Sequence, residues 1–264
     1  MSMNIDLSKQ TAVIYGAGRG IGEAIATELA KAGATVYIAD LIIENCEDLS
    51  NRLNEQGFNT KACKCDVSNF EEVDAVMAQA EAETERLDIV INNAGIVTLD
   101  SFLDTPIADI EKLIKVNLMG ANNGCQAGVK RMQKYNHGKI VNTSSFAGRH
   151  ALAEGFAHYG MTKAGVIYLT QAAAYAGADY NINVNAVCPG IIRTPMWESI
   201  LDNYENSGAD RETSWKESLK HFIPLARGDQ KPEDIAYTVL FLCSEYANHI
   251  TGQSINVDGG AAMN

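Results

Sequence analysis

A strand, a glycine-rich turn and a helix follow one another directly near the start of the chain, and this order restricts the fold more than any other feature. Residues 11–15 form an apolar run typical of a buried strand, and Gly16, Gly18, Gly20 and Gly22 follow it. Glycines permit a tight turn, and the next helix offers unpaired N–H groups and the positive end of its dipole. The segment therefore predicts an α/β fold whose first turn can hold a pyrophosphate.

The glycine spacing is not the one most common in dinucleotide-binding proteins. Gly16, Gly20 and Gly22 give the pattern G-x-x-x-G-x-G, and the pattern GxGxxG fits poorly. On its own, such a cluster is equally consistent with an ordinary turn between a strand and a helix. Further motifs have to decide between these two interpretations.

Apolar runs recur along the rest of the chain at intervals that leave room for helices. We predict strands near residues 11–15, 35–39, 60–66, 89–92, 138–143, 182–187 and 254–257. A chain of 264 residues with 46% hydrophobic residues can enclose one large core. The expected fold is α/β: a Rossmann-like, doubly wound sheet of seven parallel strands in a single domain, residues 1–264.

The charge balance and the cysteines disfavour several classes of function. A net charge of −12 disfavours nucleic acids and anionic membranes as partners, because neither gains by counterion release at an acidic surface. No apolar run is long enough to cross a bilayer, and residues 1–7 lack the basic start of an export signal, so we expect a cytoplasmic protein. Among six cysteines only Cys63 and Cys65 lie close together, on one face of a predicted strand, which favours buried free thiols over a metal site.

Asp40 ends the second predicted strand, eighteen residues after Gly22. A carboxylate there can accept hydrogen bonds from ribose hydroxyls and would repel a 2′-phosphate, which favours NAD over NADP. Arg19 in the glycine turn could instead pair with that phosphate. An ordinary turn aspartate at a strand end is the alternative interpretation of Asp40.

Tyr159 and Lys163 are four residues apart in a predicted helix and therefore share one face. A neighbouring cation favours the ionised form of a phenol and brings its pKa closer to the neutral range, where it can exchange a proton. Two fixed positions alone are more often a surface aromatic beside a solvated lysine. The motifs that accompany this pair decide its interpretation.

The order of the motifs resembles the short-chain dehydrogenase/reductase family over essentially the whole chain. The shared motifs are the glycine turn, Asp66-Val67, Asn92-Asn93-Ala94-Gly95, Asn117, Ser144 to Gly148, Tyr159 with Lys163, Pro189-Gly190 with Thr194, and residues 250–260. The resemblance implies an oxidoreductase that interconverts a secondary alcohol and a ketone with a nicotinamide cofactor, for which Asp40 favours NAD, and that assembles as a homotetramer. This chemistry requires no metal. The resemblance further implies that Ser145 binds the substrate oxygen, Tyr159 exchanges its proton, Lys163 holds the ribose and lowers the tyrosine pKa, and Asn117 anchors a water.

The resemblance also assigns residues to the cofactor. These are Gly16, Arg19, Gly20, Ile21, Gly22, Asp40, Asp66, Val67, Asn93, Ala94, Gly95, Tyr159, Lys163, Pro189, Gly190, Ile192 and Thr194.

The substrate pocket is expected near a long segment, residues 191–225, that we predict to act as a lid or specificity element. The candidate substrate residues are Ser145, Phe146, His150, Leu152, Tyr159, Gly190, Met196 and Trp197. For Trp215 we favour a packing role. The chain resembles the acetoin reductase/2,3-butanediol dehydrogenase branch, and similar sequences occur in polyol and hydroxysteroid dehydrogenases. A surface position is the alternative for His150.

Two positions depart from the family pattern. Tyr15 replaces the threonine that generally precedes the first glycine, so its hydrogen bond to the turn at residues 92–95 is expected to be rearranged or lost. The helix at residues 171–180 lacks the usual charges, which suits contact with another subunit or, alternatively, burial within one subunit. Two other functions stay open: a nucleotide-sensing binding protein, and a 3-oxoacyl-carrier-protein reductase, against which Asp40 and the acidic balance count.

Overall fold

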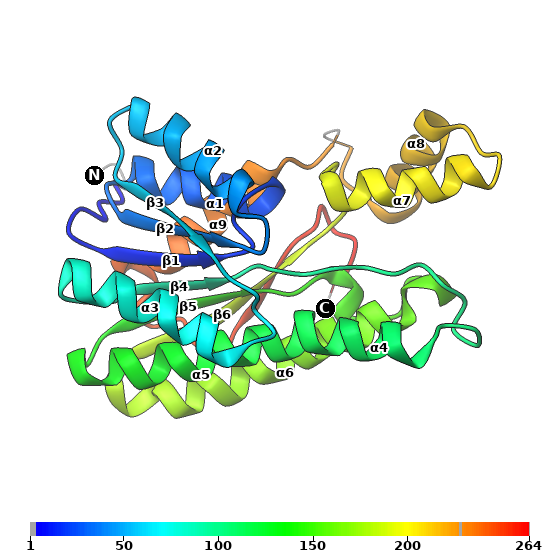
Figure 1. The fold of residues 1–264 in the computed structure, drawn as a ribbon. Helices are drawn as coiled ribbons and strands as arrows, with labels where there is room; N and C mark the ends of the chain where they lie inside the picture. Colours follow the sequence, from blue (N-terminus) through cyan, green and yellow to red (C-terminus); the bar gives the residue numbers. More distant parts are fainter. Residues whose placement is uncertain (1–3, 227–228, 264) are drawn as a thin grey trace.

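Seven parallel strands form the centre of the fold, in the order β3-β2-β1-β4-β5-β6-β7 (Figure 1). The computed structural model describes residues 4–226 and 229–263. The strands are β1 Thr11–Tyr15, β2 Thr35–Asp40, β3 Thr60–Lys64, β4 Ile89–Asn92, β5 Gly138–Thr143, β6 Ile182–Pro189 and β7 Ser254–Val257. The predicted Rossmann-like sheet of seven parallel strands is confirmed.

The strand bounds differ from the predicted ones at only a few ends. β2 extends one residue further to include Asp40, and β6 extends to Pro189. β3 stops at Lys64 rather than at residue 66. Asp66 begins a turn there, because its Oδ1 accepts hydrogen bonds from the backbone N and the hydroxyl of Ser68, at 2.9 and 2.8 Å.

Helices cover both faces of the sheet, because the side chains of each strand alternate in direction. In β1, Ala12 and Ile14 pack on one face, and Val13 and Tyr15 pack on the other. The first face is covered by α1 Gly20–Lys31, α2 Ile43–Glu55 and α9 Pro232–Cys243 (Figure 1). The second is covered by α3 Phe70–Thr84, α5 Gly120–Met132 and α6 Ala157–Gly177.

The strand order reverses between β1 and β4, and this is where open α/β sheets bind ligands. The turns after β1, β4, β5 and β6 meet at the carboxyl ends of the strands. Two more helices, α7 Pro195–Asn206 and α8 Arg211–Phe222, lie beyond these ends and apart from both helical layers (Figure 1). The predicted lid segment is thus a pair of helices.

Asn117 lies in a π-helical segment and not in a regular α-helix. α4 Ile107–Leu113 continues into the π-helical segment η1 Ile114–Met119, which contains Asn117 and leads into α5. One-turn π segments inside α-helices occur frequently at functional sites. Short 3-10 helices complete the fold: η2 Gln133–Tyr135, η3 Phe146–Gly148, η4 Glu154–Phe156, η5 Ala178–Tyr180 and η6 Glu245–Ala247.

The six cysteines are all free and buried, and Cys63 and Cys65 both pack into the core on the same face of the sheet, as predicted. Burial raises the pKa of these two thiols, to about 11 for Cys63 and about 12 for Cys65. In the described part of the chain no helix has the length and apolar character that crossing a membrane requires. Within residues 4–226 and 229–263 no three His, Cys, Asp or Glu side chains are grouped to hold a metal ion.

Candidate active site

The glycine turn after β1 requires glycine for two separate reasons. Gly16 and Gly20 have positive φ angles of 75° and 62°, which side chains rarely adopt. Gly22 has no room for a side chain, because a Cβ atom there would lie 2.0 Å from the carbonyl oxygen of Gly16. The unusual glycine spacing therefore follows from the backbone path of this turn into α1.

Asp40 lies beside this turn at the end of β2. Its Oδ2 accepts a hydrogen bond from the backbone N of Gly18 at 3.2 Å, and its Oδ1 accepts one from the backbone N of Ile42, also at 3.2 Å. Arg19, in the same turn, is exposed. Both side chains line one cavity. The fold therefore brings together Asp40, which favours NAD, and Arg19, which could pair with the 2′-phosphate of NADP.

The turn after β4 is tied to the first turn by Asn93. Its backbone N donates to the carbonyl of Tyr15 at 3.0 Å, and its Nδ2 donates to the carbonyl of Gly16 at 2.7 Å. The phenol of Tyr15 points elsewhere and donates to the carbonyl of Val73 at 2.6 Å. The expected rearrangement at Tyr15 is thus present, and the two turns stay connected through Asn93.

Asn117 connects the turn after β4 to the helix that carries Tyr159 and Lys163. Its Oδ1 accepts from the backbone N of Ile96 at 2.8 Å, and its Nδ2 donates to the carbonyl of Ile96 at 2.9 Å and to the hydroxyl of Thr162 at 3.1 Å. The side chain is buried behind the wall of the cavity and does not line it. Gly95 separates it from Lys163: a Cβ atom on Gly95 would lie 3.3 Å from Nζ of Lys163 and 3.4 Å from Oδ1 of Asn117.

Ser145, Tyr159 and Lys163 converge from the end of β5 and the start of α6. Lys163 is only 3% exposed, and its Nζ donates to the carbonyl of Thr143 at 2.9 Å. The same Nζ lies 5.7 Å from the ring centroid of Tyr159. The neighbouring Ser144 also lines the cavity, but its hydroxyl is engaged, because it donates to the carbonyl of Lys163 at 2.8 Å. Ser145 rather than Ser144 is therefore the serine available beside Tyr159.

Burial dominates the acid–base properties of this pair. It raises the pKa of Tyr159 to about 12, against a smaller lowering by a hydrogen bond with Ser145. It lowers the pKa of Lys163 to about 8. The sequence had predicted a lowered pKa for Tyr159. The structure gives the opposite direction, because removal of the phenol from water is the largest effect and outweighs the lowering by Ser145.

One cavity of about 390 Å³ joins the glycine turn to the lid helices. Of the predicted site residues, it is lined by Gly16, Arg19, Gly20, Ile21, Asp40, Asp66, Val67, Asn93, Ala94, Gly95, Ser145, Phe146, Leu152, Tyr159, Lys163, Pro189, Gly190, Ile192, Thr194, Met196 and Trp197. Gly22 and Asn117 support the wall from behind.

His150 is the exception, and the structure corrects its placement. It is exposed and does not belong to the described residues that line the cavity. The 3-10 turn η3 carries the chain outward after Phe146, and Arg149 is held against β7 through Nε, which donates to Oδ1 of Asn256 at 3.1 Å. His150 follows Arg149 to the surface.

The cavity has further walls that sequence reasoning missed: Leu41, Ile42, Ile96, Val97, Lys112, Val116, Phe156, Ile200 and Phe222. Four of these could have been predicted from the sequence, because they directly follow predicted site residues: Leu41 and Ile42 follow Asp40, and Ile96 and Val97 follow the turn after β4. No sequence feature predicts Phe156, Ile200 and Phe222, because they meet only when α7 and α8 fold back toward α6.

Aromatic side chains form the wall at the lid end. Trp197 lies 6.5 Å from Phe156 and 5.6 Å from Trp215 between ring centroids. Phe146 and Phe222 make a further edge-to-face pair at 5.9 Å. Trp215 is 2% exposed and its Nε1 donates to Asp229 at 3.0 Å, so the packing role predicted for it is confirmed.

Known proteins match this chain over almost its whole length. A family profile described as enoyl-(acyl carrier protein) reductase matches residues 16–262. Oxidoreductase UcpA of Salmonella typhimurium is 36% identical over 97% of this chain and 96% of that protein. The 3-oxoacyl-(acyl-carrier-protein) reductase FabG of Aquifex aeolicus is 36% identical over 98% and 99%. The (S)-acetoin-forming diacetyl reductase of Staphylococcus epidermidis is 36% identical over 95% and 98%.

The fold agrees with these sequence matches. The crystal structure of a short-chain type dehydrogenase/reductase from Mycobacterium marinum has a TM-score of 0.88 at 31% identity and covers 98% of both chains. The chain belongs to the short-chain dehydrogenase/reductase family. Members of this family are oxidoreductases that act on CH–OH groups with a nicotinamide cofactor, NAD or NADP.

The residues of this short-chain dehydrogenase/reductase fit such a dinucleotide. The glycine turn leaves a cradle that side chains would fill, next to the first N–H groups of α1. Asp40 offers carboxylate oxygens to hydroxyl groups. Thr143 lines the cavity, and its buried hydroxyl has no hydrogen-bond partner among the described residues. An additional polar ligand atom would satisfy it.

Proposed function

We propose that this protein interconverts a secondary alcohol and a ketone with NAD(H), and that Tyr159 exchanges the hydroxyl proton. The observation that carries the proposal is the position of Ser145, Tyr159 and Lys163 in the wall of the same cavity as the glycine turn and Asp40. A dinucleotide that extends along this cavity from Asp40 would reach the tyrosine.

Each of the three side chains has a separate task in the proposed reaction. When bound, the nicotinamide supplies or accepts the hydride. Tyr159 gives its proton to the ketone oxygen or takes it from the alcohol, and Ser145 donates a hydrogen bond to that oxygen. Lys163, held by Thr143, stabilises the phenolate that Tyr159 becomes after giving its proton. Asn117 keeps the turn after β4 in register with α6, and we propose that it also anchors a water for proton exchange.

The preference for NAD rests on Asp40. Its two oxygens are held by the backbone of Gly18 and Ile42 and cannot turn away easily, so a 2′-phosphate would meet a fixed negative charge. Arg19 is exposed, and a long charged side chain at such a position can extend into solvent. We therefore propose that repulsion of the 2′-phosphate by Asp40 outweighs its attraction to Arg19, so that NAD is preferred over NADP.

The first substrate candidate is the acetoin/diacetyl pair or a related small diol. Its support is the resemblance to the acetoin reductase branch and the 36% identity with an (S)-acetoin-forming diacetyl reductase.

The lid end of the cavity favours a second candidate, a bulkier apolar ketone such as an oxo-bile acid. Phe146, Phe156, Trp197 and Phe222 offer an apolar wall larger than a four-carbon diol needs, and a polyol would leave this wall unmatched.

A carrier-linked acyl reductase is a third candidate, since the family profile and one relative bear such descriptions. An acidic carrier protein would approach a chain whose own net charge is −12. Like charges on both partners oppose such an encounter. We rank this function below the two small-molecule candidates.

The test is oxidation of NADH and NADPH in parallel, with diacetyl, acetoin, ketohexoses, oxo-bile acids and a 3-oxoacyl carrier protein as substrates. Consumption of NADH with diacetyl or acetoin supports the first candidate, and consumption only with an oxo-bile acid supports the second. Binding of NADH without turnover of any ketone would instead favour a nucleotide-sensing protein and would overturn the proposed activity.

We propose a homotetramer in which α6 contacts a second copy of the chain. Met161, Tyr168 and Tyr175 are exposed by 49%, 74% and 87%, and their spacing of seven residues places them on one face of α6. Exposed apolar and aromatic side chains in a row are typical of an interface between subunits. The cytoplasmic location expected from the sequence stays a prediction.

A further inference from the structure

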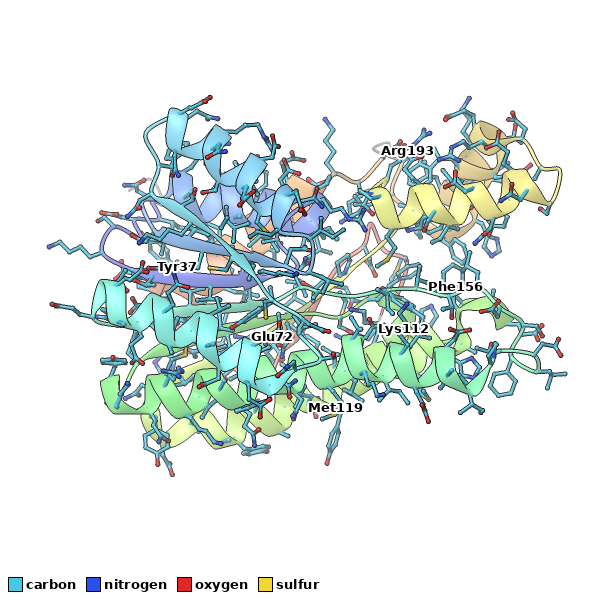
Figure 2. All side chains as sticks on the ribbon, viewed as in Figure 1. Tyr37, Glu72, Lys112, Met119, Phe156 and Arg193 are labelled. Carbon is cyan, nitrogen blue, oxygen red and sulfur yellow. The ribbon has the colours of Figure 1, made fainter. Side chains whose placement is uncertain are left out.

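Arg193 lies between the two ends of the cavity and contacts both lid helices. Its Nε donates to Oε1 of Glu198 in α7 at 2.7 Å, and its Nη1 donates to Oε2 of Glu212 in α8 at 3.0 Å. A second contact joins Nη2 to Glu212, so this carboxylate is held in a two-point arrangement. Figure 2 shows Arg193 at the start of α7, between the sheet and the lid.

The same guanidinium also reaches the aromatic wall. Its central carbon lies 5.8 Å from the ring centroid of Trp215, which is buried. Trp215 packs edge-on against Trp197 at 5.6 Å, and Trp197 lines the cavity. Arg193 thus fixes the support of a cavity wall without lining the cavity itself.

The neighbours of Arg193 face the opposite end of the cavity. Ile192 and Thr194 both line it, and a Cβ atom on Gly20 would lie 3.4 Å from Cγ2 of Thr194. Three consecutive residues therefore contact the glycine turn and the aromatic wall together. A ligand that displaces Thr194 would move Arg193, and with it the lid helices.

We propose that Arg193 is a positioning residue that couples occupation of the glycine-turn end of the cavity to closure of the aromatic wall formed by Trp197 and Trp215. Exposed ion pairs are usually weak, and Arg193 is 35% exposed. Here one cation bridges two helices, and Arg211 repeats the bridge through Glu198, Asp202 and Glu205. The proposal rests on the proposed function only for the identity of the bound cofactor.

The two tryptophans of the chain, Trp197 and Trp215, are both in this wall, so their fluorescence reports on the lid without any substrate. We compare quenching by acrylamide in the wild-type protein, Arg193→Gln and Arg131→Gln, with and without NAD⁺. Arg131 is the matched control, because it also binds two carboxylates, Asp74 and Glu81, but lies away from the cavity. Arg193→Gln should raise the quenching constant about twofold, and Arg131→Gln should leave it unchanged.

NAD⁺ should protect the tryptophans from quenching in the wild-type protein and in Arg131→Gln, but not in Arg193→Gln. Arg193→Lys should restore only part of the protection, because an ammonium cannot bind a carboxylate at two points. Wild-type quenching in Arg193→Gln, or equal protection in all variants, would overturn the proposal. Absence of NAD⁺ binding would contradict the proposed function. The comparison of quenching without ligand would still test whether the ion pairs of Arg193 with Glu198 and Glu212, the Arg193 clamp, hold the aromatic wall.

Steady-state kinetics provide a second measurement. A purely structural role of Arg193 would not change KM and kcat in the way that a positioning role predicts. Loss of the clamp should raise KM for the ketone about fivefold and leave kcat within about twofold, because the wall binds substrate but does not take part in chemistry. A fall in kcat without a change in KM would contradict a positioning role. Glu212→Gln should reproduce the effect, and the double variant should add little to either single one.

Discussion

The glycine turn and the α7–α8 lid form opposite ends of one cavity, and they are stabilised in different ways. At the glycine end, positive φ angles and the absence of room for a Cβ atom at Gly22 fix the backbone. At the lid end, exposed ion pairs around Arg193 and Arg211 and edge-to-face ring contacts hold two helices. Salt and water weaken exposed ion pairs such as these, whereas they do not change a backbone path that is fixed by sterics. We therefore expect the first end to be rigid and the second to be adjustable and to set the substrate range.

The reaction centre between the two ends should be the most sensitive point. Tyr159→Phe removes the hydroxyl that exchanges the proton and should lower kcat by about 10³-fold. The affinity for NADH, measured by fluorescence titration, should change by less than about threefold, because the phenyl ring is retained. Tyr168→Phe, on the exposed face of α6, is the control. Unchanged turnover in Tyr159→Phe would remove this residue from the mechanism.

At the glycine end, a single methyl group should be enough to disrupt the backbone. Gly22→Ala places a Cβ atom 2.0 Å from the carbonyl of Gly16 and should destabilise the fold by about 3 kcal/mol, measured by urea unfolding. Gly57→Ala is the control for backbone strain without steric overlap, because Gly57 has a φ of 88° but open space around it. This variant should lower the free energy of unfolding by about 1 kcal/mol. Equal losses in both variants would show that the overlap at Gly22 relaxes.

The nucleotide preference depends on the same end. Asp40→Ala should reduce the ratio of kcat/KM for NADH over NADPH about tenfold, because a fixed negative charge no longer opposes the 2′-phosphate. Glu44→Gln, an exposed acid on α2, should leave the ratio unchanged. An unaltered ratio in Asp40→Ala would indicate that Arg19 sets the preference.

The pKa of Lys163 predicts the pH dependence of the reaction. Its ammonium form is present below about pH 8 and is lost above it. Ketone reduction requires this charge to stabilise the phenolate of Tyr159, so the rate should be level below about pH 7, fall about twofold by pH 8 and fall about fivefold further by pH 9. Lys163→Met should be slow and lack this step, whereas Lys112→Met, which changes another lysine of the cavity, should retain it. A step that persists in Lys163→Met belongs to a different group.

The lid end should show the smallest effect, and one that depends on substrate size. Trp197→Ala removes part of the aromatic wall and enlarges the cavity, so a bulky ketone loses apolar contacts. KM should rise about threefold for a bulky ketone and less than about twofold for diacetyl. Asn206→Ala, on α7 but exposed and not among the residues that line the cavity, is the control. A larger effect of Trp197→Ala on diacetyl would mean that the wall closes on small substrates as well.

The same contrast explains how much could be predicted from the sequence. The strands and glycine turns are local: buried parallel strands are continuous apolar runs, and glycines are required where the backbone turns tightly. Asp40, Ser145, Tyr159 and Lys163 lie directly at strand ends or on one helix face, so their meeting in one cavity could be expected. Phe156 and Phe222 could not, because they come from distant segments that only the lid brings together.

Two expectations failed for physical reasons that spacing does not encode. His150 was expected in the pocket, but Arg149 is bound to Asn256 and directs the following residue to the surface. The pKa of Tyr159 was expected to fall beside Lys163, but burial of the phenol raises it. Both depend on the complete packing of η3 and α6 against the sheet.

The most direct test of the proposed chemistry is transfer of deuterium from NADH that carries deuterium at both C4 positions. The ketone consumed fastest by the protein is incubated with this cofactor, and the product alcohol is analysed by mass spectrometry. We predict one deuterium at the carbinol carbon of each product molecule, and about 10³-fold slower formation of product with Tyr159→Phe. Unlabelled product, or oxidation of NADH that does not require a ketone, would contradict hydride transfer within this cavity.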